Sequence, residues 1–463
     1  MVVYFLWLWY YSKRKVSYKL IVPCLTIFFT VEMVYNSVNS FYLLNQNECF
    51  CKHVNYVDND KTEHLRSALS QVHASDKSLY REECLPRFTC VDTALFGYRG
   101  LSTFASSNPV NFIRFMKNMG YSTNSINSCM YRDFSKFTDS IFGIKYLIVK
   151  NDYDNLDRNS LEKSIMRDSM WDIYQNGSAM PIAFAVNQNV KKFNALTENP
   201  FESQSMLFKA MFRKNVDLYK RYLISNDPDI FENSFSISKE RKFTFDVDES
   251  ATQPIYVYVD AKDAFKIRIN NGDKNIVIDN PNESFVVNVG KVNVTHKVSV
   301  NIIPKDNLKS MSGHMYVAQF LKNNFDSFVE QSRDGYLKVT DFSDTKIKGM
   351  VKISDDQVLF TSIPYSKGWQ VKVDGNLVDT FAIDHALLGA DVPYGEHLVE
   401  IYFVTPGFWW GVLISFVSVV LFILYCMFLH RMQYFALKSK ENISVKLEQG
   451  TVGDVDSRTC SKE

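Results

Sequence analysis

The feature that most constrains this chain is a run without charged residues from Phe408 to Leu429. At about 1.5 Å of rise per residue, a helix over this run crosses a hydrocarbon core of roughly 30 Å. Three aromatic residues open the run, as is typical of a membrane interface. We therefore predict a transmembrane helix at 408–429. The polar tail that follows, 430–463, shows no clear periodicity and is expected to be disordered.

A strand-rich stretch leads directly into this helix. The dipeptide Asp374-Gly375 favours a two-residue hairpin turn because both residues tolerate positive φ angles, and Asn271-Gly272 gives a second such signal. Short apolar runs separated by turn residues recur throughout the stretch. This pattern predicts an antiparallel β-sandwich over 235–406.

The N-terminal end holds two further apolar segments. Residues 1–11 span only about half of a bilayer core and predict a partial transmembrane segment, as if the chain began inside a larger membrane protein. Residues 20–44 predict a full transmembrane helix, with Glu32 near its middle and Asn36 one turn further on. A carboxylate at that depth is costly. Packing against a neighbouring helix and a functional role are both compatible with the sequence.

Basic residues indicate how the chain crosses the membrane. They gather between Lys13 and Lys19 and again from Arg431 onward, which places both segments in the cytoplasm. Residues 45–406 then lie outside, so we predict a multi-pass plasma-membrane protein with a large extracytoplasmic domain. The net charge is only +1, and no basic stripe indicates nucleic-acid binding.

The outer region from 45 to 234 mixes helical and strand patterns. Apolar spacing and end signals predict a strand within 140–150 and helices at 61–74, 111–119, 200–213 and, inside the strand-rich stretch, 315–329. The predicted fold class is therefore membrane-anchored α+β. It combines a mixed α/β extracytoplasmic region with an antiparallel β-sandwich, flanked by transmembrane helices.

The chain has eight cysteines, and five of them lie in the outer region. Cys84 and Cys90 are the closest workable pair for a disulfide in an oxidising compartment, and because five is odd, one thiol is left over or pairs elsewhere. The run from Cys49 to His53 contains soft metal ligands, but no second ligand pair accompanies it, so no metal is expected. No nucleotide-binding or hydrolase motif is present, and no cofactor or catalytic residue is predicted.

Several stretches resemble the C-terminal end of the YfhO family of bacterial membrane proteins. They are "TSIPYSKGWQVKVDG" from Thr361, "VPYGEHLVEIYFVTPGFWWG" from Val392, "SIFGIKYL" from Ser140 and "NPFE" from Asn199. The family in turn resembles the GT-C glycosyltransferases. The resemblance implies transfer of a sugar from a polyprenyl-phosphate donor to an anionic envelope polymer such as lipoteichoic acid. GT-C enzymes carry their acidic catalytic residue in the first outside loop, which this chain lacks.

Two functions from different classes follow. The first is a component of an envelope glycosyltransferase that works with a separately encoded, multi-spanning N-terminal half, and whether this chain is itself an enzyme stays open. Arg81, Arg99 and Lys145 are then candidates for binding the phosphate-bearing polymer, because guanidinium and ammonium groups pair with phosphate. Ordinary salt bridges explain these residues equally well. The second is a non-catalytic membrane-anchored module that binds glycan or protein, and a truncated fragment is a further alternative.

Overall fold

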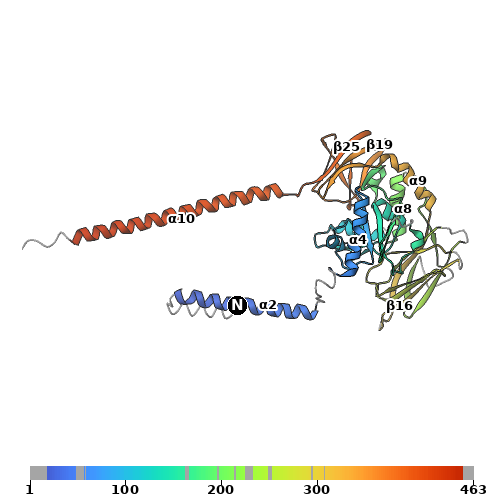
Figure 1. Ribbon diagram of the computed structural model, residues 1–463, viewed down its shortest axis with the longest axis horizontal. Helices are drawn as coiled ribbons and strands as arrows, with labels where there is room; N and C mark the ends of the chain where they lie inside the picture. The colour runs from blue at the N-terminus through green and yellow to red at the C-terminus, as the bar shows by residue number, and fades with distance from the viewer. Residues whose placement is uncertain are drawn as a thin grey trace, which may run out of the picture.

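A computed structural model of the chain describes residues 18–47, 57, 59–161, 166–195, 198–212, 215–224, 233–248, 253–292, 296–306 and 308–451. The predicted partial span at 1–11 and the run from Cys49 to His53 lie outside the described residues. Within them, a body of helices and sheets carries two long helices that extend from the same side of it (Figure 1).

The charge-free run forms helix α10, Phe408–Thr451. Among the described residues, it is the one helix with both the length and the apolar character to cross a membrane, over Phe408–Lys438. The helix also continues through 430–451, although the tail 430–463 was expected to be disordered. After Gly411, no proline or glycine interrupts the sequence before Gly450, so an established helix extends at little cost.

Helix α2, Tyr18–Asn47, covers the second predicted span and contains Pro23 in its first turns. It is a helix of spanning length, and its passage through the membrane stays a prediction. After it, α4 (Asp60–Ser75) confirms the helix predicted at 61–74. Asn59 caps α4: its side chain accepts from the backbone N–H of Thr62, while the Thr62 hydroxyl accepts from the backbone N–H of Asn59.

Helix α4 packs on a four-stranded sheet through an apolar face that includes Leu65, Leu69 and Val72. The strand order is β1 (Arg81–Leu85), β5 (Ile144–Lys150), β7 (Trp171–Gln175), β6 (Met166–Arg167). The strand predicted within 140–150 is β5, and residues 140 and 141 instead end helix α7 (Lys136–Ile141). Helices α6 (Val110–Asn118) and α8 (Pro200–Phe212) confirm the predictions at 111–119 and 200–213.

The remaining elements of this region are short and surround a large aromatic core. In chain order, the helices are α5 (Asp92–Phe96), α6 (Val110–Asn118), α7 (Lys136–Ile141) and α8 (Pro200–Phe212). A small sheet joins β2 (Thr103–Phe104), β4 (Ser128–Met130) and β3 (Ser122–Thr123).

Two sheets with a shared apolar core follow. The first has the order β10 (Ser234–Ile237), β17 (Met311–Phe320), β12 (Ile255–Asp260), β15 (Val286–Gly290), with β9 (Tyr219–Tyr222) also paired to β17. The second has the order β11 (Arg241–Asp246), β16 (Lys297–Pro304), β13 (Ala264–Asn270), β14 (Asn275–Asp279). The predicted hairpin at Asn271-Gly272 joins β13 to β14.

A second pair of sheets lies next to the membrane helix and has its own core. One sheet has the order β18 (Lys338–Ser343), β19 (Lys346–Ile353), β25 (Gly395–Phe403), β21 (Trp369–Val373), β22 (Asn376–Val378). The other has the order β23 (Thr380–Ile383), β24 (Leu387–Ala390), β20 (Gln357–Pro364), β8 (Ala183–Asn187). Asp374 (φ +49°) and Gly375 (φ +86°) form the predicted hairpin turn, and β25 leads into α10 through residues 404–407.

The structure corrects two predictions about the strand-rich stretch. The region 235–406, expected as one β-sandwich, is divided between two apolar cores, and β8 from the preceding region joins the second. The helix predicted at 315–329 is wrong in its first half, where β17 continues to Phe320. Only α9, Lys322–Ser332, is helical. The end of β17 is buried on both faces, so its sequence does not show the alternation typical of a strand.

The contact between Gly120 and β15 generates a prediction. Gly120 has φ +89°, and an added Cβ would lie 2.4 Å from a methyl carbon of Val286. We expect Gly120→Ala to lower the free energy of unfolding by about 2–4 kcal/mol, through backbone strain and overpacking. Gly97→Ala is the matched control, because Gly97 has φ +72° but no atom within 4 Å of the added carbon. Denaturant titration of both variants checks this, and equal losses would contradict the packing argument.

Candidate anion-binding cleft

Arg81, one of three predicted polymer-binding residues, is used inside the body. Its guanidinium donates hydrogen bonds to the carbonyl oxygen of Phe142 at 2.6 Å and to the hydroxyl of Ser362 at 2.6 Å. A third bond reaches the carbonyl oxygen of Ser362 at 2.9 Å. Burial lowers the pKa of Arg81 to about 10. These contacts join β1 to β20, so the geometry favours a structural role for this residue.

Lys145 and Arg99 lie nearby but make separate contacts. Lys145 forms an ion pair with Asp76 at 2.6 Å and lies over the ring of Tyr80. Arg99 is exposed and stacks on the ring of Phe342, 5.1 Å from its centre. The structure thus brings the three backbones into one neighbourhood but does not aim their side chains at one ligand. Polymer binding by these residues stays a prediction.

The other predicted site residues are dispersed. Glu32 and Asn36 lie on α2, where Asn36 is exposed and Glu32 is partly covered. Cys84 is fully buried beside α4, whereas Cys90 is exposed, and both are free thiols. The structure therefore does not contain the proposed disulfide. Because Cys84 points into an apolar core, burial raises the pKa of its thiol well above the ordinary value.

A cleft of about 410 Å³ lies where the α/β region meets the loop between β14 and β15. One wall comes from the segment after β1, from β4 and the residues that follow it, and from Tyr153. The opposite wall comes from residues 276–287. The polar side chains in the lining that matter for binding an ion are those of Arg87, Arg132, Asp133, Glu283, Ser122 and Tyr153.

Two arginines place positive charge in the cleft. Arg87 and Arg132 both line it, and within the described part of the chain no carboxylate forms an ion pair with either guanidinium. Arg87 donates to the sulfur of Met130, a weak acceptor. Partial burial lowers the pKa of Arg132, and the nearby positive charge of Arg87 adds to this decrease. The negative charge of Glu283 acts on the pKa of Arg132 in the opposite direction without forming an ion pair, so the two neighbouring cations still favour an anionic ligand.

Acidic groups line both walls of the cleft. Glu283 accepts a hydrogen bond from the hydroxyl of Ser122 at 2.5 Å. Asp133 is buried and accepts from the backbone N–H groups of Phe134 at 2.7 Å and Asn288 at 2.8 Å. Burial outweighs these bonds and raises the pKa of Asp133. Its carboxyl group therefore adds less negative charge than an exposed aspartate would.

Glu83 lies behind Arg87 in the core. Its carboxyl group is fully buried and accepts from the backbone N–H of Leu101 at 2.5 Å and from both the backbone N–H and the hydroxyl of Ser102, at 3.0 and 2.9 Å. Burial nevertheless raises its pKa to about 7. The carboxyl group is thus protonated in the folded chain over a range in which an exposed glutamate is ionised.

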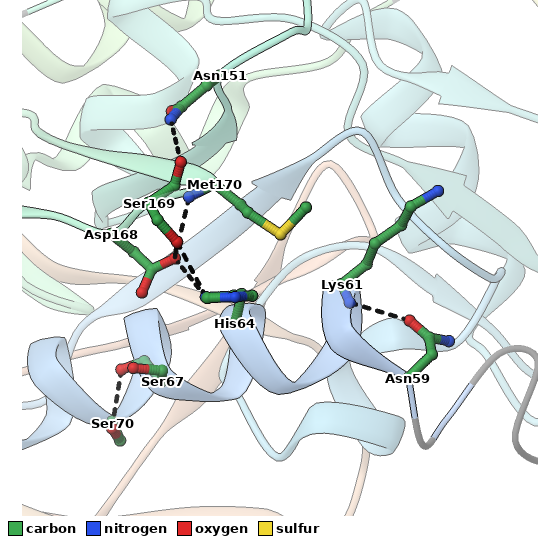
Figure 2. Close-up of polar contacts among 9 residues, drawn as sticks. All are labelled: Asn59, Lys61, His64, Ser67, Ser70, Asn151, Asp168, Ser169 and Met170. Carbon is green, nitrogen blue, oxygen red and sulfur yellow. Dashed lines mark hydrogen bonds and ion pairs between the residues drawn. The ribbon is translucent and has the colours of Figure 1, made fainter.

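A second polar constellation contains the residue types of a hydrolase triad but not its geometry. Figure 2 shows Asp168, Ser169 and His64 between α4 and the turn before β7. Both Asp168, at 2.9 Å, and the Ser169 hydroxyl, at 3.3 Å, contact the same ring nitrogen of His64, Nδ1. A triad needs the serine and the aspartate on opposite ring nitrogens. These contacts therefore attach α4 to the sheet and do not activate a nucleophile.

No group of three histidine, cysteine, aspartate or glutamate side chains arranged to hold a metal occurs among the residues that the structure describes. The cleft was not found from the sequence because its walls come from three distant segments. Arg132 and Arg87 are isolated basic residues in the sequence, and nothing near either predicts that they meet.

The fold defines a membrane-anchored α/β protein with a large body beside its membrane helix. The chain belongs to the family described as bacterial membrane protein YfhO, whose model matches residues 1–415. A relative from Bacillus subtilis (strain 168), the uncharacterized protein YfhO, is 24% identical over 203 residues. That match covers 43% of this chain and 21% of the relative, so the chain spans about a fifth of its length.

Solved structures with a weak likeness belong to the arabinofuranosyltransferase AftD from mycobacteria. One, of a mutant form, is 12% identical with a TM-score of 0.15 and covers 36% of this chain and 13% of that chain. Another is 7% identical with a TM-score of 0.14 and covers 56% of this chain and 29% of that chain. Likeness at this level carries no argument about function.

Glu83 generates a prediction about pH. Its folded-state pKa of about 7 lies above the ordinary 4.5, so the folded state binds the proton more tightly than the unfolded state. This contribution to stability is complete below about pH 4.5 and is lost as the pH rises through 7, with a total of roughly 3 kcal/mol. We expect Glu83→Gln, which mimics the protonated group, to remove that decrease. Unfolding free energies measured from pH 4.5 to 8 check it, and an unchanged slope in the variant would refute the assignment.

Proposed function

We propose that this chain is the outer, C-terminal portion of a membrane glycosyltransferase of the cell envelope. The enzyme uses a polyprenyl-phosphate sugar to glycosylate a surface polymer such as lipoteichoic acid. The observation that carries the proposal is the pair Arg87 and Arg132, which face the cleft without ion-pair partners among the described residues. Donor and polymer both carry phosphate, which guanidinium groups bind through paired, charge-assisted hydrogen bonds. Membership of the YfhO family supports the same assignment.

In this proposal α2 and α10 both cross the plasma membrane, and the body lies on the extracytoplasmic side. Two observations support this arrangement. The two helices extend from the same side of the body (Figure 1), and basic residues follow the membrane segment of α10. We also infer that the two pairs of sheets act as β-sandwiches, one around each apolar core. The body is then held at the bilayer surface by α2, which precedes it in the chain, and by α10, which follows it.

The transfer step itself is assigned to a separately encoded N-terminal half, which would supply the catalytic carboxylate. The present chain would hold the phosphate-bearing substrate and position it. Arg87 and Arg132 bind the phosphate group, while Glu283 and Asp133 accept hydrogen bonds from hydroxyl groups next to it.

A non-catalytic binding module is the second candidate. It is favoured by the geometry of His64, Asp168 and Ser169, in which the serine and the aspartate contact the same ring nitrogen. Such a module would use the same cleft and hold anionic glycan at the membrane without any transfer. Purification of the chain from its native membrane in mild detergent, with identification of bound proteins by mass spectrometry, separates the two candidates. A multi-spanning partner supports the enzyme, and the folded chain alone supports the module.

The cleft predicts the effect of two substitutions on phosphate binding. We expect Arg132→Gln and Arg87→Gln each to weaken the binding of glycerol 3-phosphate by about tenfold, because each removes a charge-assisted hydrogen bond of roughly 1.5 kcal/mol. Calorimetric titration of the full chain in detergent measures this. Arg333→Gln serves as the control, since Arg333 is exposed and pairs with Glu330 on α9. Unchanged affinity in both cleft variants would sink the proposal.

A further inference from the structure

The first turns of α4, Asp60–Ser75, are connected to a loop that leads to the cleft. The turn that carries Asp168, Ser169 and Met170 lies between α4 and the loop that follows β5 (Figure 2). There the side chain of Asn151 donates to the carbonyl oxygen of Ser169 at 3.1 Å, and Ser169 contacts His64 of α4.

The same loop leads into a wall of the cleft. Asp152 pairs with Lys150, and this hydrogen bond lowers the pKa of Asp152, with a smaller contribution from the charge of Lys61 in the first turn of α4. Tyr153, the next residue, lines the cleft. The first turn of α4 is therefore near the residue that precedes Tyr153 in the cleft wall.

An exposed apolar rim borders the wall that comes from the segment after β1 and from β4. It consists of Val91, Phe104, Val110 and Ile126, which are 40%, 48%, 40% and 61% exposed. Two of them are next to residues that line the cleft. Phe104 pairs with Ser128, which lines the cleft, and Val91 follows Cys90, which also lines it.

Backbone contacts hold the rest of this rim in place. The backbone N–H of Ala105 donates to the carbonyl oxygen of Asn127 at 3.2 Å, and the side chain of Asn108 donates to the same oxygen at 2.8 Å. The loop before α6 is thereby fixed against the turn that carries Ile126. Grouped apolar side chains on a surface mark an interaction site, because each gains free energy when it leaves water.

We propose that the apolar rim inserts into the outer surface of the bilayer that α10 crosses, so that the cleft binds a phosphate ester carried by a lipid. This inference rests on the proposed function of the cleft and names the source of its ligand. The phosphate headgroup lies between Arg87 and Arg132, while the rim residues contact the acyl chains next to it.

Two observations favour the bilayer over a protein partner as the occupant of the rim. The body is joined to α10 by residues 404–407 alone, so it stays at the membrane surface. Helix α6, which starts at Val110 of the rim, also carries the exposed Arg114 and the partly exposed Lys117, and basic residues beside an inserting surface attract anionic headgroups.

The proposal is tested with the full chain in lipid nanodiscs of phosphatidylcholine containing phosphatidic acid. A photoreactive benzoylphenylalanine replaces Ile126 in one sample and Leu377 in the other. Leu377 is the matched control, because it is 63% exposed but lies beside the Asp374-Gly375 turn. That turn is at the end of its sheet opposite the β25 residue that leads to α10. We expect cross-linking to lipid at position 126 to exceed that at 377 by about tenfold. Equal yields would overturn the proposal.

Two further variants separate this inference from the function on which it rests. The first is a rim variant that combines Phe104→Ser and Ile126→Ser. Compared with the unchanged chain, it should bind phosphatidic acid in nanodiscs about tenfold more weakly and bind inorganic phosphate in detergent equally well. Arg132→Gln should weaken both. If the rim variant captures phosphatidic acid as well as the unchanged chain does, the lipid source is wrong while the cleft stands. If Arg132→Gln leaves inorganic phosphate binding unchanged, the cleft itself is wrong.

Discussion

The antiparallel pairing of β8 with β20 is the interaction on which the arrangement of the body depends. It places residues 183–187 beside 357–361, so that a strand of the first region completes a sheet of the last. Arg81 reinforces this junction from β1, because its guanidinium bonds both a carbonyl near β5 and Ser362 at the end of the pairing. A buried guanidinium held by neutral acceptors is costly to disturb, since any lost bond leaves a charge unsatisfied. The two regions therefore form one unit.

The elements with strong local signals could be predicted from the sequence. Helix α4 has an Asn cap and an apolar face, α8 begins at Asn199-Pro200, and the hairpins at Asn271-Gly272 and Asp374-Gly375 carry their own turn chemistry. Strand β17 defeated the same reasoning, because burial on both faces removes the alternation that distinguishes a strand from a buried helix. The division of the strands between two cores could not be predicted either, since β8 contributes from a distant part of the chain.

The candidate site could not be predicted, for a related reason. The residues chosen from the sequence were basic side chains in stretches that resemble the family, and Arg81 and Lys145 in fact bond inside the body. What distinguishes Arg87 and Arg132 is that both line one cleft, and this depends on the position of the loop between β14 and β15. Such a property belongs to the folded chain and has no counterpart in a local pattern.

The short link between β25 and α10 has a mechanical consequence. Strand β25 is bonded on both sides, to β19 and β21, and the backbone N–H groups of Phe403 and Val404 are also bonded, to carbonyl oxygens of Thr345 and Gly368. Residues 404–407 leave little slack between this sheet and the membrane helix. A tilt or rotation of α10 would therefore move the sheet with it. The β8–β20 pairing would transmit this movement to the region that carries the cleft. Any neighbouring helix that moves α10 within the bilayer would thus reorient Arg87 and Arg132 without touching them.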